Sequence, residues 1–515
     1  MDASLLPLLL ILPILSAICM LLPNTPALDD QRKAWIWALT STLATFIVSL
    51  IVAVRFNWDA TATTQLGGQI PWIPGIGLSF SYGVDTISLW LVLLTTFLMP
   101  LVILGSRTAI ESRIREYYFW LLLLEALMIG VFIARDIIFF YLCFELTLVP
   151  LYFLIGVFGS SQRLKAAAMF FLYTFAGSML TLGGVLYVAW YASTMQGATG
   201  WTFDIDALGA AARTMSFTEQ AWVLAALLAG FAVKVPLWPV HTWLPLAHTE
   251  APTAGSVVLA GVLLKLGTYG LLRFALPWCP DAVVVFAPYI GIFAVVGILY
   301  TALVCWVQKD VKKLIAYSSV SHLGFCVLGL FALDAVPMVG SGMETSAGGV
   351  GSVMYMINHG LSTGALFLCI GMIYERFHTR EMAQMSGLGR VMPIWATFTV
   401  FFVLASVGLP GLNGFVSEFL TLLGAFTSPE GVLGISYAVA AGFGMIFAAI
   451  YLLYMVGKVV FGPTKVPAHG HGHGHGAGGG HNAGAAHGHG VTDLNVREIL
   501  TLAPLAVGCL VLGLT

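Results

Sequence analysis

Apolar stretches of about 20 residues recur along nearly the whole chain, and this recurrence limits the fold more than any other feature. A bilayer core about 30 Å thick is crossed by a helix of about 20 mostly apolar residues. Of the 515 residues, 59% are hydrophobic and 9% are charged, against about 25% charged in an ordinary soluble domain. A helix satisfies its own backbone groups in lipid, so we expect an all-α polytopic membrane protein. A membrane β-barrel would show alternating segments of about ten residues, which the sequence lacks.

The apolar runs and the residues that interrupt them predict about fourteen transmembrane helices. We expect the helices to begin near Leu5, Ala34, Val84, Tyr118, Ile137, Ala166, Ala221, Thr253, Val283, Val311, Gly349, Ile394, Val432 and Ile499. No Lys or Arg precedes Arg32, so the first run is interpreted as a retained helix and not as a secretion signal.

Basic residues are distributed unequally between the two sets of loops. Loops after even-numbered helices hold four of the 22 basic residues, two more fall inside predicted helices, and all others lie in loops after odd-numbered helices. Cytoplasmic loops of membrane proteins carry an excess of Lys and Arg. The distribution therefore places both termini on the outer, periplasm-like side.

Two predicted helices contain helix-breaking residues in their middle. The seventh runs into Lys234-Val-Pro-Leu-Trp-Pro239, and the twelfth contains Gly408-Leu-Pro-Gly-Leu-Asn-Gly414. Proline removes a backbone donor and glycine adds slack, so we expect both helices to be discontinuous. The breaks are five helices apart, which gives helices 4–8 and 9–13 opposite orientations, the inverted-repeat arrangement of many transporters. The alternative is a pair of ordinary proline kinks.

This pattern divides the chain into five segments. We expect an N-terminal three-helix segment (1–117), a first inverted repeat (118–276), a second inverted repeat (277–462), a Gly/His-rich inner loop (463–492) and a C-terminal helix (493–515). From His469 to Gly490 the loop is almost entirely Gly, His and Ala. Such a composition is typical of a flexible linker, although its histidines would also suit zinc or nickel.

Cysteine spacing and net charge exclude two classes of function. The 7 cysteines are scattered singly, without the paired spacing of iron–sulfur or redox sites, and we interpret them as small buried apolar residues. The net charge of -2 offers no basic surface for nucleic acid. We assign this chain no metal site.

Ionisable residues within the predicted helices are candidates for function, because a buried charge is costly unless it is paired or solvated. The sequence offers Glu125, Glu145, Lys234, Lys265, His322, His359 and Glu418.

Three of these candidates relate to the breaks. Lys234 precedes the break of helix 7, where the carbonyl-rich end of a half-helix favours a cation, and Glu418 is expected in the first turn after the break of helix 12, where free N–H groups favour an anion. Glu145 has no basic residue in its own helix, so Lys234 is its natural partner. A carboxylate about 4 Å from an ammonium contributes about 4 kcal/mol at an effective dielectric near 20, and moving it would load or release the lysine proton. The structural alternative is that each charge only ties down a broken helix.

The remaining candidates suggest a route through the bundle. Lys265, His322 and His359 lie mid-helix on three further helices, and since histidine titrates near physiological pH they would form a proton relay. The alternative is that each histidine is a hydrogen-bonded packing residue, which a lone intramembrane histidine more often is. Glu125 is a further candidate for the relay.

An inner entry path is expected beside the break of helix 7, because three more titratable residues follow it closely. They are His241, His248 and Glu250.

Two motifs carry a resemblance to a known family. The stretch KVPLWPVHTWLPLAH from Lys234 to His248, continuing to Lys265-Leu-Gly267, resembles the signature of the proton-conducting subunits of respiratory complex I and of multi-subunit cation/proton antiporters. The stretch GLPGLNGFVSE that ends at Glu418 resembles the second-repeat signature, and the similarity covers essentially the whole chain. The family has lysine at this last position in most members and glutamate in subunit M of bacterial NADH-quinone oxidoreductase. Glu418 therefore indicates the subunit M branch, and the lack of a long extension after Thr515 is unlike subunit L.

The resemblance implies a proton-translocating, non-redox subunit in the membrane arm of a bacterial inner-membrane complex, driven by quinone reduction in partner subunits. It implies that Glu145 and Lys234 form a half-channel pair, that Lys265 links them to the centre, and that Glu418 ends the relay towards the outer exit. NADH, FMN, iron–sulfur clusters and quinone would belong to partner subunits, and this chain would bind no redox cofactor. Its expected partners are lipid and other membrane-arm subunits, especially the neighbouring antiporter-like subunits. The histidine-rich loop departs from the family pattern.

Two rival functions fit the same fold. One is a subunit of a sodium/proton antiporter, which Glu418 disfavours. The other is a scaffold subunit whose buried charges only hold helices together.

Overall fold

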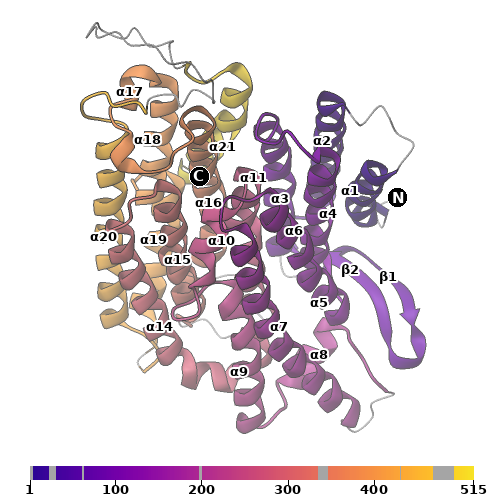
Figure 1. Cartoon of the computed structure of the whole chain (residues 1–515). Helices are drawn as coiled ribbons and strands as arrows, with labels where there is room; N and C mark the ends of the chain where they lie inside the picture. The colour runs from indigo at the N-terminus through magenta and orange to yellow at the C-terminus, as the bar shows by residue number, and fades with distance from the viewer. Residues whose placement is uncertain are drawn as a thin grey trace, which may run out of the picture.

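Helices dominate the computed structural model, which describes residues 4–22, 30–60, 63–195, 200–333, 346–429, 431–467 and 492–514. The helices in these ranges are α1 (Leu5–Leu21), α2 (Gln31–Arg55), α3 (Thr86–Gly105), α4 (Ile114–Ile133), α5 (Ile137–Leu146), α6 (Leu148–Phe158), α7 (Arg163–Thr194), α8 (Ile205–Ala212), α9 (Phe217–Lys234), α10 (Trp243–Glu250), α11 (Thr253–Val258), α12 (Leu264–Gly270), α13 (Leu276–Trp278), α14 (Pro280–Trp306), α15 (Val311–Leu330), α16 (Ala347–Phe377), α17 (Leu388–Val391), α18 (Pro393–Val407), α19 (Asn413–Thr427), α20 (Ile435–Val459) and α21 (Val496–Leu514). Most of the long helices run roughly alongside one another as a bundle (Figure 1).

The bundle has the helix lengths and surface of a membrane protein. Among the described residues, 11 helical segments are long and apolar enough to cross a bilayer, and α1 and α18 are shorter apolar helices. Large apolar side chains such as Leu164, Leu172 and Phe443 are exposed on the outer faces, where lipid would cover them. The predicted number of fourteen spans and the two inverted repeats stay predictions.

Both interruptions expected from proline and glycine are present. The helix α9 ends at Lys234 and α10 begins at Trp243, while α18 ends at Val407 and α19 begins at Asn413. Gly408 caps α18 with a φ of 80°, a left-handed conformation that glycine adopts without strain.

Two further irregularities were not predicted. One apolar span is divided at Thr147 into α5 and α6. The span from Thr253 to Trp278 is buried along almost its whole length and contains π-helical segments at Leu259–Leu263 and Leu271–Ala275. A π-helical turn leaves backbone carbonyls without their usual partners and is frequent at functional sites.

A β-hairpin lies between α2 and α3, so the all-α expectation is incomplete. Strand β1 (Gln65–Ile73) pairs antiparallel with β2 (Leu78–Val84), with Ile70 opposite Phe80. Figure 1 shows the hairpin at the edge of the bundle beside α5.

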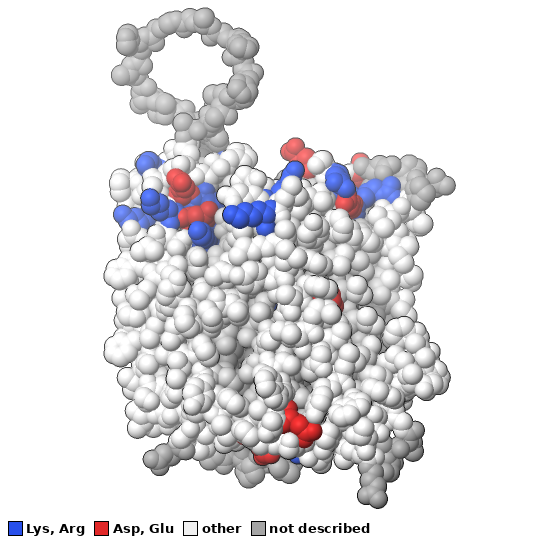
Figure 2. Space-filling view, turned by 60° about the horizontal axis from the view of Figure 1, so that its bottom comes forward, with Lys and Arg blue, Asp and Glu red and all other residues white. Residues whose placement is uncertain are grey.

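Charged side chains gather at the two ends of the bundle. Figure 2 shows Lys and Arg with some Asp and Glu at one end, a broad band almost without charge, and acidic residues at the other end. We call the first the basic end. Backbone hydrogen bonds from Met382 to Lys309 and between Ser386 and Lys465 tie the loop after α16 to the loops after α14 and α20. The unequal distribution inferred from the loops is therefore visible in three dimensions.

Candidate functional site

The second break places Glu418 in a chain of hydrogen-bonding groups. Glu418 is buried on α19, and its Oε1 accepts a hydrogen bond of 3.0 Å from the hydroxyl of Tyr355 on α16. The same hydroxyl lies 2.7 Å from Nδ1 of His322 on α15. Because the hydroxyl donates to Glu418, it accepts from a protonated Nδ1 of His322. Glu418, Tyr355 and His322 thus form one continuous hydrogen-bonded unit.

The position of Glu418 along its helix differs from the expected one. It is the sixth residue of α19, in the second turn, so the prediction that it occupies the first turn is wrong. Helical side chains lean towards the N-terminus of their helix, and the carboxylate accordingly reaches back to Gly408 in the break, where a Cβ would collide with Oε2. The missing side chain of Gly408 leaves room for this carboxylate.

Lys265 and His359 form a second unit at the centre of the bundle. Both are buried, and Lys265 Nζ lies 2.8 Å from His359 Nδ1. The ammonium also donates to the carbonyl oxygen of Ala260, which belongs to the π-helical segment Leu259–Leu263. The irregular turn thus holds a cation by its backbone and turns it towards α16.

The two units approach each other through their histidines. The ring centroids of His322 and His359 are 5.9 Å apart, with an angle of 50° between the rings. His359 Nε2 is buried and has no hydrogen-bond partner in the described part of the chain. Four helical elements therefore bring five polar side chains into one buried row, in the order Lys265, His359, His322, Tyr355 and Glu418.

The first break is arranged differently from the expected ion pair. Lys234 is the last residue of α9, and its Nζ donates 2.9 Å to the carbonyl oxygen of Phe144 while lying 3.6 Å from the centroid of the Phe144 ring. Both carboxylate oxygens of Glu145 are buried without a hydrogen-bond partner among the described residues. The expected contact between Glu145 and Lys234 is therefore replaced by one to the preceding residue.

The division of α5 from α6 explains this replacement. Phe144 lies in the last turn of α5, where carbonyl groups lack intrahelical partners, and Thr147 Oγ1 also donates to its oxygen, at 2.7 Å. The C-terminal ends of α5 and α9 therefore meet at the Lys234 ammonium, and both helix dipoles favour a cation there. No signal for the division at Thr147 was recognised in the sequence.

The remaining predicted residues lie apart from the row. Glu125 on α4 is buried without a partner in the described residues. His241 packs against Tyr300 and Tyr317.

Two residues of the predicted entry path occupy different positions near the end of α10. The Glu250 carboxylate accepts 2.7 Å from the backbone N–H of Gln162 and therefore ties a loop. The buried His248 ring stacks on Phe367 at 4.6 Å, and neither ring nitrogen has a partner among the described residues.

Sequence reasoning overlooked two residues that contact the predicted site residues, and it placed a third residue in a loop although that residue lies in a helix. Tyr355 was overlooked because a tyrosine in an apolar helix looks like a packing residue. Phe144 acts through its backbone carbonyl group. Every residue has such a group, so the residue type gives no signal for this contact. Lys312 was counted as a loop cation but is the second residue of α15 and is buried.

An ion network at the end opposite the basic end was also missed. Asp85 caps α3 and binds Arg273, and Arg135 lies 4.0 Å from the same carboxylate oxygen. Burial opposes ionisation of Asp85, but the Arg273 guanidinium, the Ser88 backbone N–H and Arg135 together outweigh it and hold the pKa of this carboxyl below its usual value. The network joins the end of the buried span Thr253–Trp278, which contains Arg273, to α3.

The described residues contain no group of three or more His, Cys, Asp or Glu side chains that could hold a metal ion. The histidine-rich stretch His469 to Gly490 lies outside those residues, so its prediction as a linker is not addressed.

Comparisons with known proteins agree on the relatives of this chain. Residues 134–444 match the family model described as NADH:quinone oxidoreductase/Mrp antiporter, TM. NADH-quinone oxidoreductase subunit M of Rhodobacter capsulatus is 46% identical over 440 residues, covering 85% of this chain and 82% of that protein. NADH-ubiquinone oxidoreductase chain 4 of Marchantia polymorpha is 40% identical, covering 98% of this chain and 92% of that protein. A chain in the structure of respiratory complex I from Thermus thermophilus is similar with a TM-score of 0.81 and 28% identity, covering 100% of this chain and 95% of that one.

Proposed function

The chain belongs to the NADH:quinone oxidoreductase/Mrp antiporter membrane family, and we propose that it moves protons through the buried row from Lys265 to Glu418. It is a proton-translocating membrane-arm subunit of an NADH-quinone oxidoreductase, the complex to which its relatives belong by name. The finer proposal is that this subunit performs no redox step. NADH, FMN, iron–sulfur clusters and quinone lie in partner subunits, whose quinone reduction drives the protons.

The single observation that carries the proposal is that two hydrogen-bonded units of the row lie next to each other. Hydrogen bonds of 2.7 and 3.0 Å join His322, Tyr355 and Glu418, and 2.8 Å separates Lys265 from His359. A proton added to His322 at its other nitrogen releases the Nδ1 proton to the hydroxyl, which passes its own proton to Glu418. Each transfer moves one proton without an electron. Rotation of the His359 ring would bring its free Nε2 towards His322 and close the remaining step.

In this proposal the first break supplies a second site, Lys234, at which a proton is bound and released. Phe144 and Glu145 are adjacent, so the Lys234 ammonium needs only a small side-chain movement to pass from the carbonyl of one to the carboxylate of the other. The carboxylate favours the charged lysine and the carbonyl position leaves it easier to deprotonate. Such a pair would respond to a movement of α5 relative to α9.

The proposed orientation in the membrane is based on the distribution of the basic residues. The basic end faces the cytoplasm of a bacterial inner membrane, and both termini lie on the periplasmic side. The two inverted repeats and fourteen spans belong to this proposal. Neighbouring antiporter-like subunits of the membrane arm are the expected protein partners.

Replacement of Glu418 tests the proposal. Glu418→Gln keeps the shape and a hydrogen-bond acceptor but cannot bind and release a proton, so proton pumping by the assembled complex should fall at least about tenfold. Glu418→Lys should be milder than Glu418→Ala, because lysine also carries a proton. Proton uptake and quinone reduction are measured in vesicles and normalised to assembled complex. Full pumping by the alanine variant would favour the scaffold function, and transport that requires sodium would favour the antiporter.

A further inference from the structure

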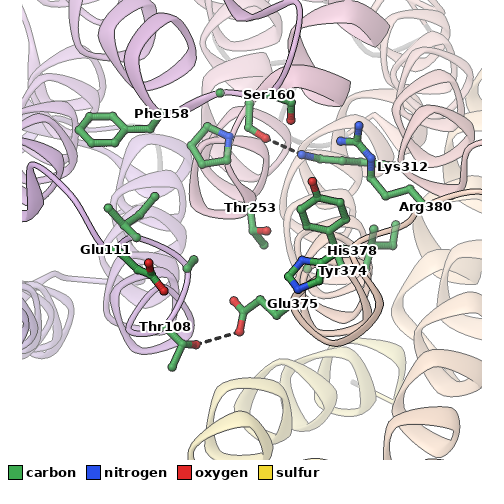
Figure 3. A pocket seen from close by; sticks show the side chains of 17 residues that line it. Thr108, Glu111, Phe158, Ser160, Thr253, Lys312, Tyr374, Glu375, His378 and Arg380 are labelled. Carbon is green, nitrogen blue, oxygen red and sulfur yellow. Dashed lines mark hydrogen bonds between the residues drawn. The ribbon is translucent and has the colours of Figure 1, made fainter. Parts of the chain in front are cut away.

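The buried span Thr253–Trp278 has two unlike ends. At the basic end a pocket of about 470 Å³ opens beside Thr253, and polar side chains such as Lys312 and Glu375 line it (Figure 3). Towards the opposite end of the bundle, which we call the outer end, the span packs on α4, α5 and α9 through aromatic rings. Water can therefore reach the start of the span, while apolar rings fill the space around its last turns.

These rings form one connected group. Phe274 lies in the second π-helical segment, and its ring centroid is 4.6 Å from that of Phe140 on α5 and 6.1 Å from that of Phe231 on α9. The Phe144 ring closes the group at 5.5 Å from Phe140 and 5.8 Å from Phe231. We call the group the ring cluster; its members are all buried, and they are Phe132, Phe140, Phe144, Phe231, Tyr269 and Phe274.

The ring cluster lies between two buried lysines and the outer end. On α9, which runs from the outer end to the first break, Phe231 comes about one turn before Lys234. Along the buried span, Tyr269 follows Lys265 by about one turn on the side of the outer end. The Phe144 ring covers Lys234 directly, with 3.6 Å from Nζ to the ring centroid. The direct way from either lysine to the outer end therefore passes the rings.

The ring cluster offers water very few partners. Its one polar side-chain group is the Tyr269 hydroxyl, which donates 3.4 Å to the carbonyl oxygen of Phe132. The packing is also close, because a Cβ at Gly270 would collide with the Phe231 ring. A buried water molecule needs two to four polar partners, and cavities lined by apolar side chains stay dry. The cluster therefore excludes the water molecules that would pass a proton onward.

An ion network covers the ring cluster at the outer end. Arg273 binds Asp85 and lies 5.3 Å from the centroid of the Tyr269 ring. Arg135 lies 4.0 Å from Asp85 and 2.6 Å from Asp206, whose side chain is 74% exposed. The network thus extends from the outer solvent to the rings. Its guanidinium groups do not release protons near neutral pH, so they hold the rings in place without carrying protons.

We propose that the ring cluster is a seal that separates Lys234 and Lys265 from water at the outer end. A pump loses its gradient if one group exchanges protons with both sides of the membrane at once. With the seal closed, protons on these lysines reach the outer side only through the buried row and Glu418. The seal rests on the proposed function of the row, and it gives that function its direction.

A leak measurement tests the seal. Phe274→Asn places an amide in the ring cluster and gives water hydrogen-bonding partners, whereas Phe274→Leu keeps the position apolar. The complex is reconstituted in liposomes that contain a pH-sensitive dye, and a potassium diffusion potential is applied with valinomycin in the absence of NADH. We expect at least a tenfold higher proton flux per complex for Phe274→Asn than for the unsubstituted complex. Phe274→Leu should stay tight, and so should Phe402→Asn, which places the same amide at a buried position of α18.

Measurements with NADH separate the seal from the relay. The Phe274→Asn complex should oxidise NADH at a rate that an uncoupler no longer raises, and it should build up at most a tenth of the normal proton gradient. Glu418→Gln should instead pump slowly in liposomes that stay tight. Normal pumping by Glu418→Gln would contradict the relay, whatever the leak is.

Other results would overturn the seal. Phe140→Ser opens the same ring cluster from α5 and decides the question should Phe274→Asn not assemble. Tight liposomes with either assembled variant would show that the rings do not hold protons back. An equal leak from Phe402→Asn or Phe274→Leu would show that the leak does not come from water in the ring cluster.

Discussion

The two interrupted helices hold their charges in opposite ways. At the first break Lys234 lies against the carbonyl and ring of Phe144, and the neighbouring Glu145 carboxylate has no partner in the described residues. At the second break Glu418 is joined to Tyr355 and His322 by consecutive hydrogen bonds. Similar proline- and glycine-containing breaks therefore support one cation held by a backbone carbonyl group and one anion in a network of side-chain hydrogen bonds.

The difference follows from the backbone around each charge. The carbonyl groups at a helix C-terminus can stabilise Lys234 without any counterion, and this leaves the lysine free to change partner. Glu418 is one turn beyond the nearest free N–H groups and depends on side chains from α15 and α16. We infer that the first break is suited to a change of partner by Lys234. The second break is suited to the conduction of protons through the network of Glu418.

The largest expected effect concerns the switching role of Lys234. Lys234→Ala and Lys234→Arg should both lower proton pumping and coupled quinone reduction at least about tenfold, because alanine carries no proton and arginine does not release one. Lys458→Arg, a substitution of a lysine beside Tyr454, should be neutral. Normal rates with Lys234→Arg, normalised to assembled complex, would show that the lysine is only a structural cation.

A smaller effect is expected from the room beside Glu418. Gly408→Ala adds a Cβ that collides with Oε2 and also strains a residue at φ 80°, so it should displace the carboxylate and reduce pumping several-fold. Gly411 has a φ of 91° and nothing near its would-be Cβ. Gly411→Ala should therefore cost a similar backbone strain, about 1–2 kcal/mol, and leave pumping per complex unchanged. Equal pumping by the two variants would mean that the Gly408 position does not matter for conduction.

The smallest effect is expected outside both breaks. Deletion of Gly470 to Gly488 from the histidine-rich stretch should leave assembly and turnover within experimental error, because its composition is that of a linker. The check is NADH oxidation by the purified complex with and without added zinc. A large loss that zinc reverses would give the stretch a metal-dependent role.

Sequence reasoning identified the broken helices because proline and glycine act locally, and it found the buried charges because few ionisable residues occur in such apolar stretches. The structure brings Lys265 Nζ to 2.8 Å from His359 Nδ1 and the rings of His322 and His359 to 5.9 Å between centroids, whereas the proton relay expected of these three residues stays a prediction. Sequence reasoning could not place Tyr355 between His322 and Glu418, because that depends on how three helices pack. The contact between Lys234 and Phe144 depends on a helix end at Thr147 for which no signal was recognised.

The most direct test of conduction at the second break removes only the hydroxyl of Tyr355. Tyr355→Phe keeps the ring and its stacking on Phe325 but removes the hydroxyl that bridges His322 Nδ1 and Glu418 Oε1, which lie 3.8 Å apart and beyond direct hydrogen-bonding distance. Tyr437→Phe is the matched control, since it removes a hydroxyl that donates to the Pro288 carbonyl away from the row. Protons translocated per NADH oxidised, and the rate of coupled turnover, are measured in vesicles with equal amounts of assembled complex. The account predicts at least a tenfold lower rate of proton translocation for Tyr355→Phe and no change for Tyr437→Phe; wild-type translocation by Tyr355→Phe would contradict it.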